Sequence, residues 1–195
     1  SGNDEEIIVK KSETQTDKVA EVSVDTSALT PEYQEYYKQI SALADEYPDV
    51  KGLYENFADY DAELLELVIK SPETAGFVKD YPSKHNISVI PDVSKEYEPG
   101  QIPLFIQWDE RWGYSTYGDN MMAINGCGPT CLAMVAVGLT GNTNYHPRYV
   151  ADLSERNGYY SETGTSWNLM TEGAQEMGLT GYSLNITSDN IKSEL

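Results

Sequence analysis

The sequence predicts an α+β protein in which a small all-α module precedes a mixed unit of helices and strands. Between residues 29 and 82, apolar residues recur at steps of three to four, which is the helical period. Beyond residue 101, helical runs alternate with strand-like runs, and all three tryptophans and both cysteines lie there. Hydrophobic residues make up 39% of the 195 residues, which is enough to build a core.

The charge of the chain narrows the classes of partner. Lys and Arg number 13 against 32 Asp and Glu, so the formal net charge is −19. A chain this acidic lacks the basic footprint that binds nucleic acid, and it lacks a polybasic patch for an anionic membrane. No apolar run approaches 18 residues, so we expect no transmembrane segment. The two cysteines make no disulfide framework and no zinc-spaced cluster, so we expect no cofactor and no metal.

Residues 1–28 predict an acidic flexible tail. They hold seven acids and three lysines without a lasting period, although residues 7–9 and 22–24 could each add a short edge strand. The chain starts at Ser1 without an initiator Met, which is typical of a cloning remnant or of a processed chain. We therefore expect a signal sequence to have been removed and the protein to be extracellular or attached to the cell surface.

Residues 29–82 predict the helical module. Thr30 is an N-cap candidate followed by Pro31 at the favoured first position, and Pro48 ends this first helix. Further helices are expected over 50–57, from Asp59 or Asp61 to residue 69, and from Ser71 to a stop at Pro82. Their tyrosines are interpreted as half-buried rings with hydroxyls at the rim, and a ligand-binding stripe is the alternative.

Residues 83–101 predict a connector, because prolines stand among polar residues; one strand over 87–90 is possible, and His85 is expected to be solvated. Residues 102–195 then predict the following elements, in order: a strand over 103–107, an apolar helix from 126 to Gly138 or Gly141, a helix from 147 to 157, a helix capped by Thr165 or Ser166 and ended by Gly178, a strand over 179–184, and a helix from Ser188 or Asp189.

Cys127 is the residue that suggests chemistry. It stands between Gly126 and Gly128, where a loop turns into the apolar helix. Helix N-termini carry unpaired N–H groups and a partial positive charge, which stabilise a thiolate, and small flanking residues would let a substrate backbone approach the sulfur. Pro129 has no backbone N–H, but an N–H in the first helical turn has no acceptor within the helix, so proline costs no hydrogen bond there. Cys131, one turn further on, is expected to be a buried small hydrophobe.

The wider pattern resembles a known family. The run Ile-Pro-Leu-Phe-Ile-Gln-Trp-Asp-Glu-Arg-Trp-Gly-Tyr from residue 102, then Tyr-Gly from residue 117 and Gly-Cys-Gly-Pro-Thr-Cys from residue 126, resembles the C39-like branch of the papain-like cysteine peptidases. Later segments are also similar to that family: Tyr-His-Pro-Arg-Tyr-Val-Ala-Asp from residue 145 and Gly-Thr-Ser-Trp from residue 164. The resemblance covers about residues 101–195 and leaves the helical module outside.

The resemblance implies a papain-like domain and a secreted bacterial cysteine-type peptidase that cleaves a peptide or protein substrate through a thioester. It makes Cys127 the nucleophile and the Gln107 side chain an oxyanion donor, for which a strand-end surface residue is the alternative. Trp108 and Trp112 are expected to be core and groove wall. The competing function is a catalytically inactive module that binds peptide or cell-wall material, and a related acyl transferase or amidase is a narrower option.

The family's catalytic histidine is missing from its expected place. The chain has no histidine after His146, which precedes Pro147 and is expected to be an N-cap or loop residue. We expect the 195 residues to be a C-terminally incomplete domain; a histidine from a second chain and an inactive relative are the alternatives. Spacing selects neither Asp152 nor Asp189 as a third triad member. Whether the helical module restricts the cleft or is an accessory domain stays open, as does the oligomeric state.

Overall fold

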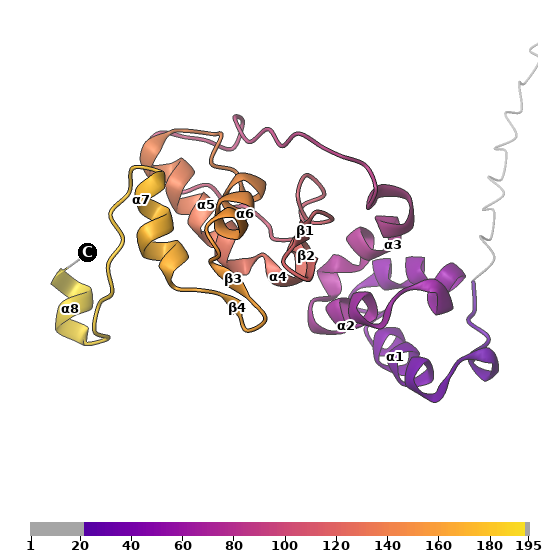
Figure 1. Ribbon diagram of the computed structural model, residues 1–195. Helices are drawn as coiled ribbons and strands as arrows, with labels where there is room; N and C mark the ends of the chain where they lie inside the picture. The colour runs from indigo at the N-terminus through magenta and orange to yellow at the C-terminus, as the bar shows by residue number, and fades with distance from the viewer. Residues whose placement is uncertain (1–21, 194–195) are drawn as a thin grey trace, which may run out of the picture.

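The computed structural model describes residues 22–193, and it is mixed and mostly helical, with a few short strands. Figure 1 shows the helical module, coloured indigo to magenta, beside a second unit that runs from salmon to yellow. This agrees with the predicted order of a helical part and a mixed part. Residues 7–9, the first predicted tail strand, lie outside the described residues.

The module consists of short helices that pack around an apolar cluster. Its elements are the 3-10 helices η1 (Thr26–Ala28), η2 (Pro48–Asp59) and η3 (Pro72–Thr74) and the α-helices α1 (Pro31–Ala42), α2 (Ala62–Lys70) and α3 (Ala75–Lys84). The spacing predicted the helical character because each element turns one apolar side inward. Fully buried side chains at the centre are Ile40, Val50, Leu53, Leu65, Val68 and Val78.

The start of α1 follows the predicted signals. The Thr30 hydroxyl accepts a hydrogen bond from the Tyr33 amide at 3.3 Å, and Pro31 is the first helical residue. The helix ends at Ala42 and does not continue to Pro48, since the Leu43 amide bonds the Ile40 carbonyl at 3.0 Å and tightens the last turn.

Two further predictions, one for the module and one for the tail, need correction. Pro82 does not end the last helix, because α3 continues to Lys84 and the His85 amide still bonds the Tyr81 carbonyl at 3.0 Å. Pro82 gives up one donor in the final turn and no more. The strand at 22–24 is absent: Val24 packs on the module, and Asp25 caps η1 by accepting from the Ser27 amide.

Two tyrosines of the module have half-buried rings and hydrogen-bonded hydroxyls, as the sequence predicted. The Tyr33 hydroxyl donates to the Tyr60 carbonyl at 2.7 Å, and the Tyr36 hydroxyl bonds the Glu66 carboxylate at 3.1 Å. Both rings are partly buried against the apolar cluster. Burial, together with the bonds to Glu66 and Glu32, raises the pKa of Tyr36 to about 12, so this hydroxyl remains a donor.

Three predicted strands are not formed in the described chain: 87–90, 103–107 and 179–184. Residues 102–106 do alternate, with Pro103 and Phe105 buried while Ile102 and Leu104 are 52% and 79% exposed. The period was right, but a strand also needs a partner whose position the local pattern does not specify.

The second unit is built around one long helix, α5 (Cys127–Thr140), which packs on α6 (Pro147–Arg156). Gly141 ends α5 with a φ of 71°, as predicted for a glycine C-cap. The remaining elements are the antiparallel pair β1 (Thr116–Tyr117) and β2 (Asn120–Met121), α4 (Met122–Asn125), the antiparallel pair β3 (Tyr160–Ser161) and β4 (Gly164–Thr165), the π-helix η4 (Leu169–Gly173), α7 (Ala174–Glu176) and α8 (Ser188–Ser193).

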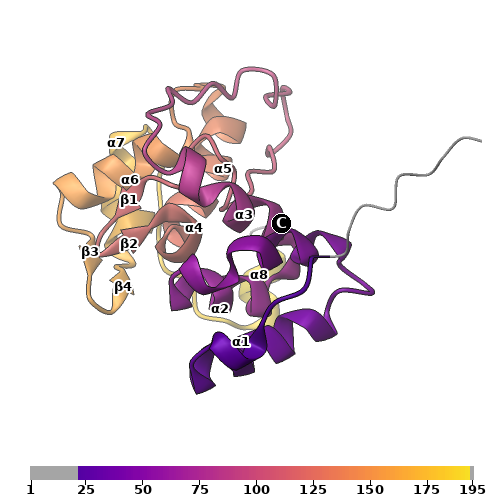
Figure 2. The ribbon, with the colours of Figure 1, turned by 90° about the vertical axis from the view of Figure 1, so that its right-hand side faces the viewer.

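The module and the second unit share part of their core. Ala123 of α4 is buried in the apolar cluster of the module. The Phe77 and Tyr114 rings stack with centroids 4.1 Å apart, and the Tyr114 hydroxyl donates to the Phe77 carbonyl at 2.8 Å. Figures 1 and 2 both show α3 and α2 beside α4. Residues 29–82 are therefore packed onto the unit that carries Cys127.

Candidate functional site

Cys127 is the first residue of α5, and its side chain is exposed. The short helix α4 leads into it through Gly126, whose amide bonds the Met122 carbonyl at 2.8 Å. The thiol therefore lies at the N-terminal end of a 14-residue helix, where the N–H groups and the helix dipole favour negative charge. This is the local geometry that the sequence predicted.

The flanking glycines also have a packing role. A Cβ at Gly126 would lie 2.5 Å from the Met122 carbonyl oxygen, and a Cβ at Gly128 would lie 3.0 Å from the Thr165 side chain. Gly126 is buried against α4, whereas Gly128 is partly exposed beside the Thr165 side chain. Glycine is required at position 126 so that α4 can pack against the start of α5, and a side chain at position 128 would press on Thr165 of the β3–β4 hairpin.

A hydrogen-bond network holds that hairpin in place. The buried Tyr117 hydroxyl lies 2.8 Å from Ser154 Oγ and 2.9 Å from Thr165 Oγ1. The Asn125 amide donates to the Tyr160 hydroxyl at 3.0 Å and to the Tyr117 carbonyl at 3.2 Å. The Tyr-Gly pair at residue 117 is part of the family resemblance, but the connection from Tyr117 to Thr165 spans 48 residues and has no local signal.

Gln107 lies against the segment that leads to Cys127. Its Nε2 donates to the carbonyls of Met122 and Ala123, at 3.1 and 3.0 Å. Both amide hydrogens are therefore directed at α4. Gln107 must release one of these bonds before it can donate to an oxyanion, and in this arrangement it fixes the turn that precedes the thiol.

Cys131 is exposed, so the prediction of a buried small hydrophobe is wrong. It lies one turn after Cys127, and Val135 and Leu139 continue the same side of the helix with exposures of 40% and 67%. The helix is apolar on nearly every side, so its composition could not show which side its neighbours would cover.

Both histidines have partners away from the thiol. His146 caps α6, with Nδ1 accepting from the Tyr149 amide at 3.1 Å, which confirms the expected N-cap. Burial lowers the pKa of His146, which keeps the ring neutral. His85 stacks on Tyr81 at 4.4 Å, and its Nδ1 lies 2.7 Å from the Tyr81 carbonyl, so the ring is partly buried, whereas the sequence predicted a solvated one.

The candidate acids have other surroundings. Asp152 forms an ion pair with Arg148 one helical turn earlier on α6. Asp189 lies in the first turn of α8, near the end of the described residues. Neither carboxylate is selected as a partner for Cys127, so the third triad member stays open.

Two of the three tryptophans, Trp108 and Trp112, have the structural positions that the sequence predicted. Trp112 is fully buried, and its indole N–H donates to the Ile106 carbonyl at 2.9 Å. Trp108 is partly buried and lines two hollows between the module and the second unit. Trp167, which follows the β3–β4 hairpin, is 84% exposed.

The smaller hollow shares one residue, Gln107, with the candidate site. It encloses about 330 Å³ between α2, which supplies Leu67, and the opposite wall of Gln107, Trp108 and Ile124. Gln107, the candidate oxyanion donor, therefore lines this hollow, and Ile124 precedes Cys127 by three residues, whereas Cys127 itself is not part of the lining.

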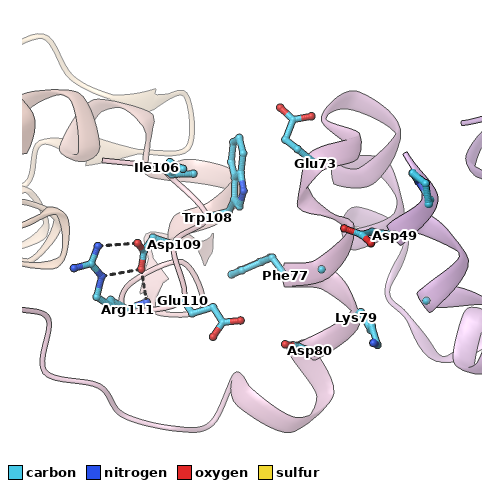
Figure 3. Close-up of a pocket in the computed structure, with 13 residues that line it drawn as sticks. Asp49, Glu73, Phe77, Lys79, Asp80, Ile106, Trp108, Asp109, Glu110 and Arg111 are labelled. Carbon is cyan, nitrogen blue, oxygen red and sulfur yellow. Dashed lines mark hydrogen bonds and ion pairs between the residues drawn. The ribbon is translucent and has the colours of Figure 1, made fainter. Parts of the chain in front are cut away.

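The larger hollow, about 840 Å³, lies on the other side of Trp108. Figure 3 shows Trp108 and Ile106 on one wall and Glu73 and Phe77 on the other. Several of its charges neutralise one another. Lys84, just outside it, pairs with Asp80 and Glu110 at 2.9 and 2.8 Å, and Arg111 pairs with Asp109 at 2.8 Å.

Residues 22–193 bring no three His, Cys, Asp or Glu side chains together as a metal site. In the same residues, no helix has both the length and the apolar composition that a bilayer crossing requires. Compared with known proteins, the chain matches no protein-family model, no curated protein and no solved structure.

Proposed function

We propose that this chain is a papain-like, C39-like cysteine peptidase that cleaves an amide bond of a peptide or protein substrate outside the cell or at its surface. One observation carries the proposal: an exposed thiol begins a 14-residue helix, and the segment before it is held by the side-chain amide of Gln107. A thiolate at a helix N-terminus is an activated nucleophile, and a nearby amide donor is a source of oxyanion stabilisation.

The reaction has two covalent steps. Cys127 Sγ attacks the substrate carbonyl carbon, the C–N bond breaks, and the amine leaves with one proton. Water then attacks the thioester carbonyl, the C–S bond breaks, and the acid and the free thiol are formed. Gln107 donates to the carbonyl oxygen in both steps after giving up one of its bonds to α4.

Proton transfer requires a base that neither histidine provides in place. The Nδ1 of His146 is occupied as a helix cap, and His85 is stacked in the module. The proposal therefore has two parts. Cys127 and Gln107 supply the reactive thiol and the oxyanion donor. Turnover needs, in addition, a proton acceptor other than His85 and His146.

The test uses the second cysteine as a matched control. Cys131 lies on the same helix and is also exposed, so it differs from Cys127 chiefly in its distance from the helix start. We expect iodoacetamide and an E-64-type epoxide to modify Cys127 faster than Cys131, measured by mass spectrometry of the native protein. Equal, slow modification of the two residues would overturn the assignment.

A non-catalytic peptide- or cell-wall-binding module is the second candidate, and the engagement of both histidines favours it. It predicts that Cys127→Ala leaves binding of peptide or wall fragments unchanged and that the unaltered protein hydrolyses neither. Because turnover needs a further proton acceptor, acylation by an activated ester is the readout that separates the two functions. A peptidase loses this acylation in Cys127→Ala and keeps it in Cys131→Ser.

A further inference from the structure

We propose that the hollow between α2 and Gln107 is the substrate subsite of this peptidase and that it takes the side chain of a Lys or Arg residue. This inference rests on the proposed function and adds a substrate class to it. It also gives the helical module a part in specificity, because α2 supplies one wall.

The position of the hollow suits a subsite. Its lining includes Gln107, the candidate oxyanion donor, and Ile124, which precedes Cys127 by three residues. Ile124 lies in α4 and Cys127 begins α5, so three Cα–Cα steps of about 3.8 Å place the two residues no more than about 11 Å apart. One residue of an extended peptide spans about 3.3 Å. A side chain one or two residues from the reacting carbonyl can therefore enter the hollow while the carbonyl lies at the thiol.

The walls suit a long aliphatic stem. Leu67 of α2, Trp108 and Ile124 line the hollow and give it apolar surface. Lys and Arg side chains bury their methylene groups on such surfaces and keep the charged end near water. Trp108 adds an aromatic face, on which a cation is attracted by the ring quadrupole. The volume, about 330 Å³, is at the small end of ligand pockets and suits one side chain.

The charged groups that line the hollow all come from α2: the two carboxylates of Glu63 and Glu66 and the ammonium of Lys70. Glu63 uses Oε2 to accept from the Asn120 amide at 2.6 Å, which leaves the lone pairs of Oε1 for a cation. Glu66 accepts from the Tyr36 hydroxyl at 3.1 Å and lies 3.5 Å from Lys70. The Lys70 side chain is 73% exposed, so this pair is weak and a substrate cation can replace it.

The charge of the whole molecule acts in the same direction. A net charge of −19 attracts basic peptides over a longer range and raises their encounter rate. That field does not select one residue of a peptide, whereas two carboxylates beside an apolar wall do. Selectivity for one position in the peptide is therefore the signature of the subsite.

The experiment compares peptidyl chloromethyl ketones in two sets of three. One set varies the residue next to the reactive group, and the other varies the residue before it. In each set the varied residue is Arg, norleucine or Glu. The second-order rate of Cys127 alkylation is measured by intact mass. We expect Arg to react about fivefold faster than norleucine, as one partly exposed ion pair allows, and Glu to be slowest. In Glu63→Gln and Glu66→Gln, we expect the Arg advantage to fall toward one.

Two controls keep this result separate from the proposed function. Glu35→Gln removes an exposed acid of α1 that is outside the hollow, and it should leave the Arg advantage unchanged. Iodoacetamide, which carries no side chain, should modify Cys127 at the same rate in every variant. Equal rates for Arg and norleucine, with Cys127 still preferred by iodoacetamide, would overturn the subsite alone. Loss of that preference would overturn the peptidase.

Discussion

Truncation of Phe77 tests whether the helical module and the Cys127-bearing unit unfold together. Phe77 belongs to α3, is 5% exposed, and stacks on Tyr114 of the second unit at 4.1 Å. Phe77→Ala removes a buried ring and leaves a cavity, which costs about 4 kcal/mol. With a urea dependence of about 2 kcal/mol per molar, the midpoint should fall by about 2 M.

The tryptophans make this measurement specific to one unit. All three tryptophans follow the connector, but Trp108 packs on the apolar cluster of the module. In a Trp108→Phe background, fluorescence from Trp112 and Trp167 reports the second unit, whereas circular dichroism reports helices in both. We expect Phe77→Ala to lower both midpoints equally. A double-mutant cycle with Tyr114→Ala should give a coupling of about 1 kcal/mol for the stacked pair. A fluorescence midpoint that stays constant while the dichroism midpoint falls would refute the shared core.

Three further predictions concern the second unit. His146→Asn keeps an N-cap for α6 and removes a group whose pKa is lowered by burial from 6.5. Because the unfolded chain takes up the proton first, the unaltered protein should lose stability as the pH falls below 6.5, and His146→Asn should lose less in urea titrations across that range. Tyr117→Phe leaves the buried Ser154 hydroxyl without its partner and should lower the free energy of unfolding, measured by urea titration, by about 2 kcal/mol. An unchanged free energy of unfolding would show that water reaches the Ser154 hydroxyl. Gly141→Ala forces a side chain into a φ of 71° and should lower stability by about 1 kcal/mol, whereas Gly76→Ala, which meets nothing within 4 Å, should not.

Local signals predicted the helices well. Thr30 and His146 cap helices because each cap depends on the next three residues alone. Gly141 ends α5 for the same kind of local reason. The start of α5 at Cys127, which defines the candidate site, belongs to this class.

Predictions that depend on distant residues failed or stay open. The alternation at 102–106 predicts a strand, yet pairing requires a partner whose place is set by the whole fold. The exposure of Cys131 depends on which neighbours cover α5, and the apolar helix does not show them. The packing of Gly128 against Thr165 and of Gln107 against α4 likewise joins segments that the sequence cannot place together.

Trapping the acyl-enzyme tests most directly whether Cys127 is the nucleophile. The protein is incubated with a p-nitrophenyl ester of a short peptide, quenched in acid, and mapped by mass spectrometry. We predict an acyl group on Cys127 in the unaltered protein and in Cys131→Ser, and none in Cys127→Ser. Acylation shared equally between Cys127 and Cys131, or p-nitrophenol release unchanged in Cys127→Ser, would contradict the assignment of Cys127 as the nucleophile.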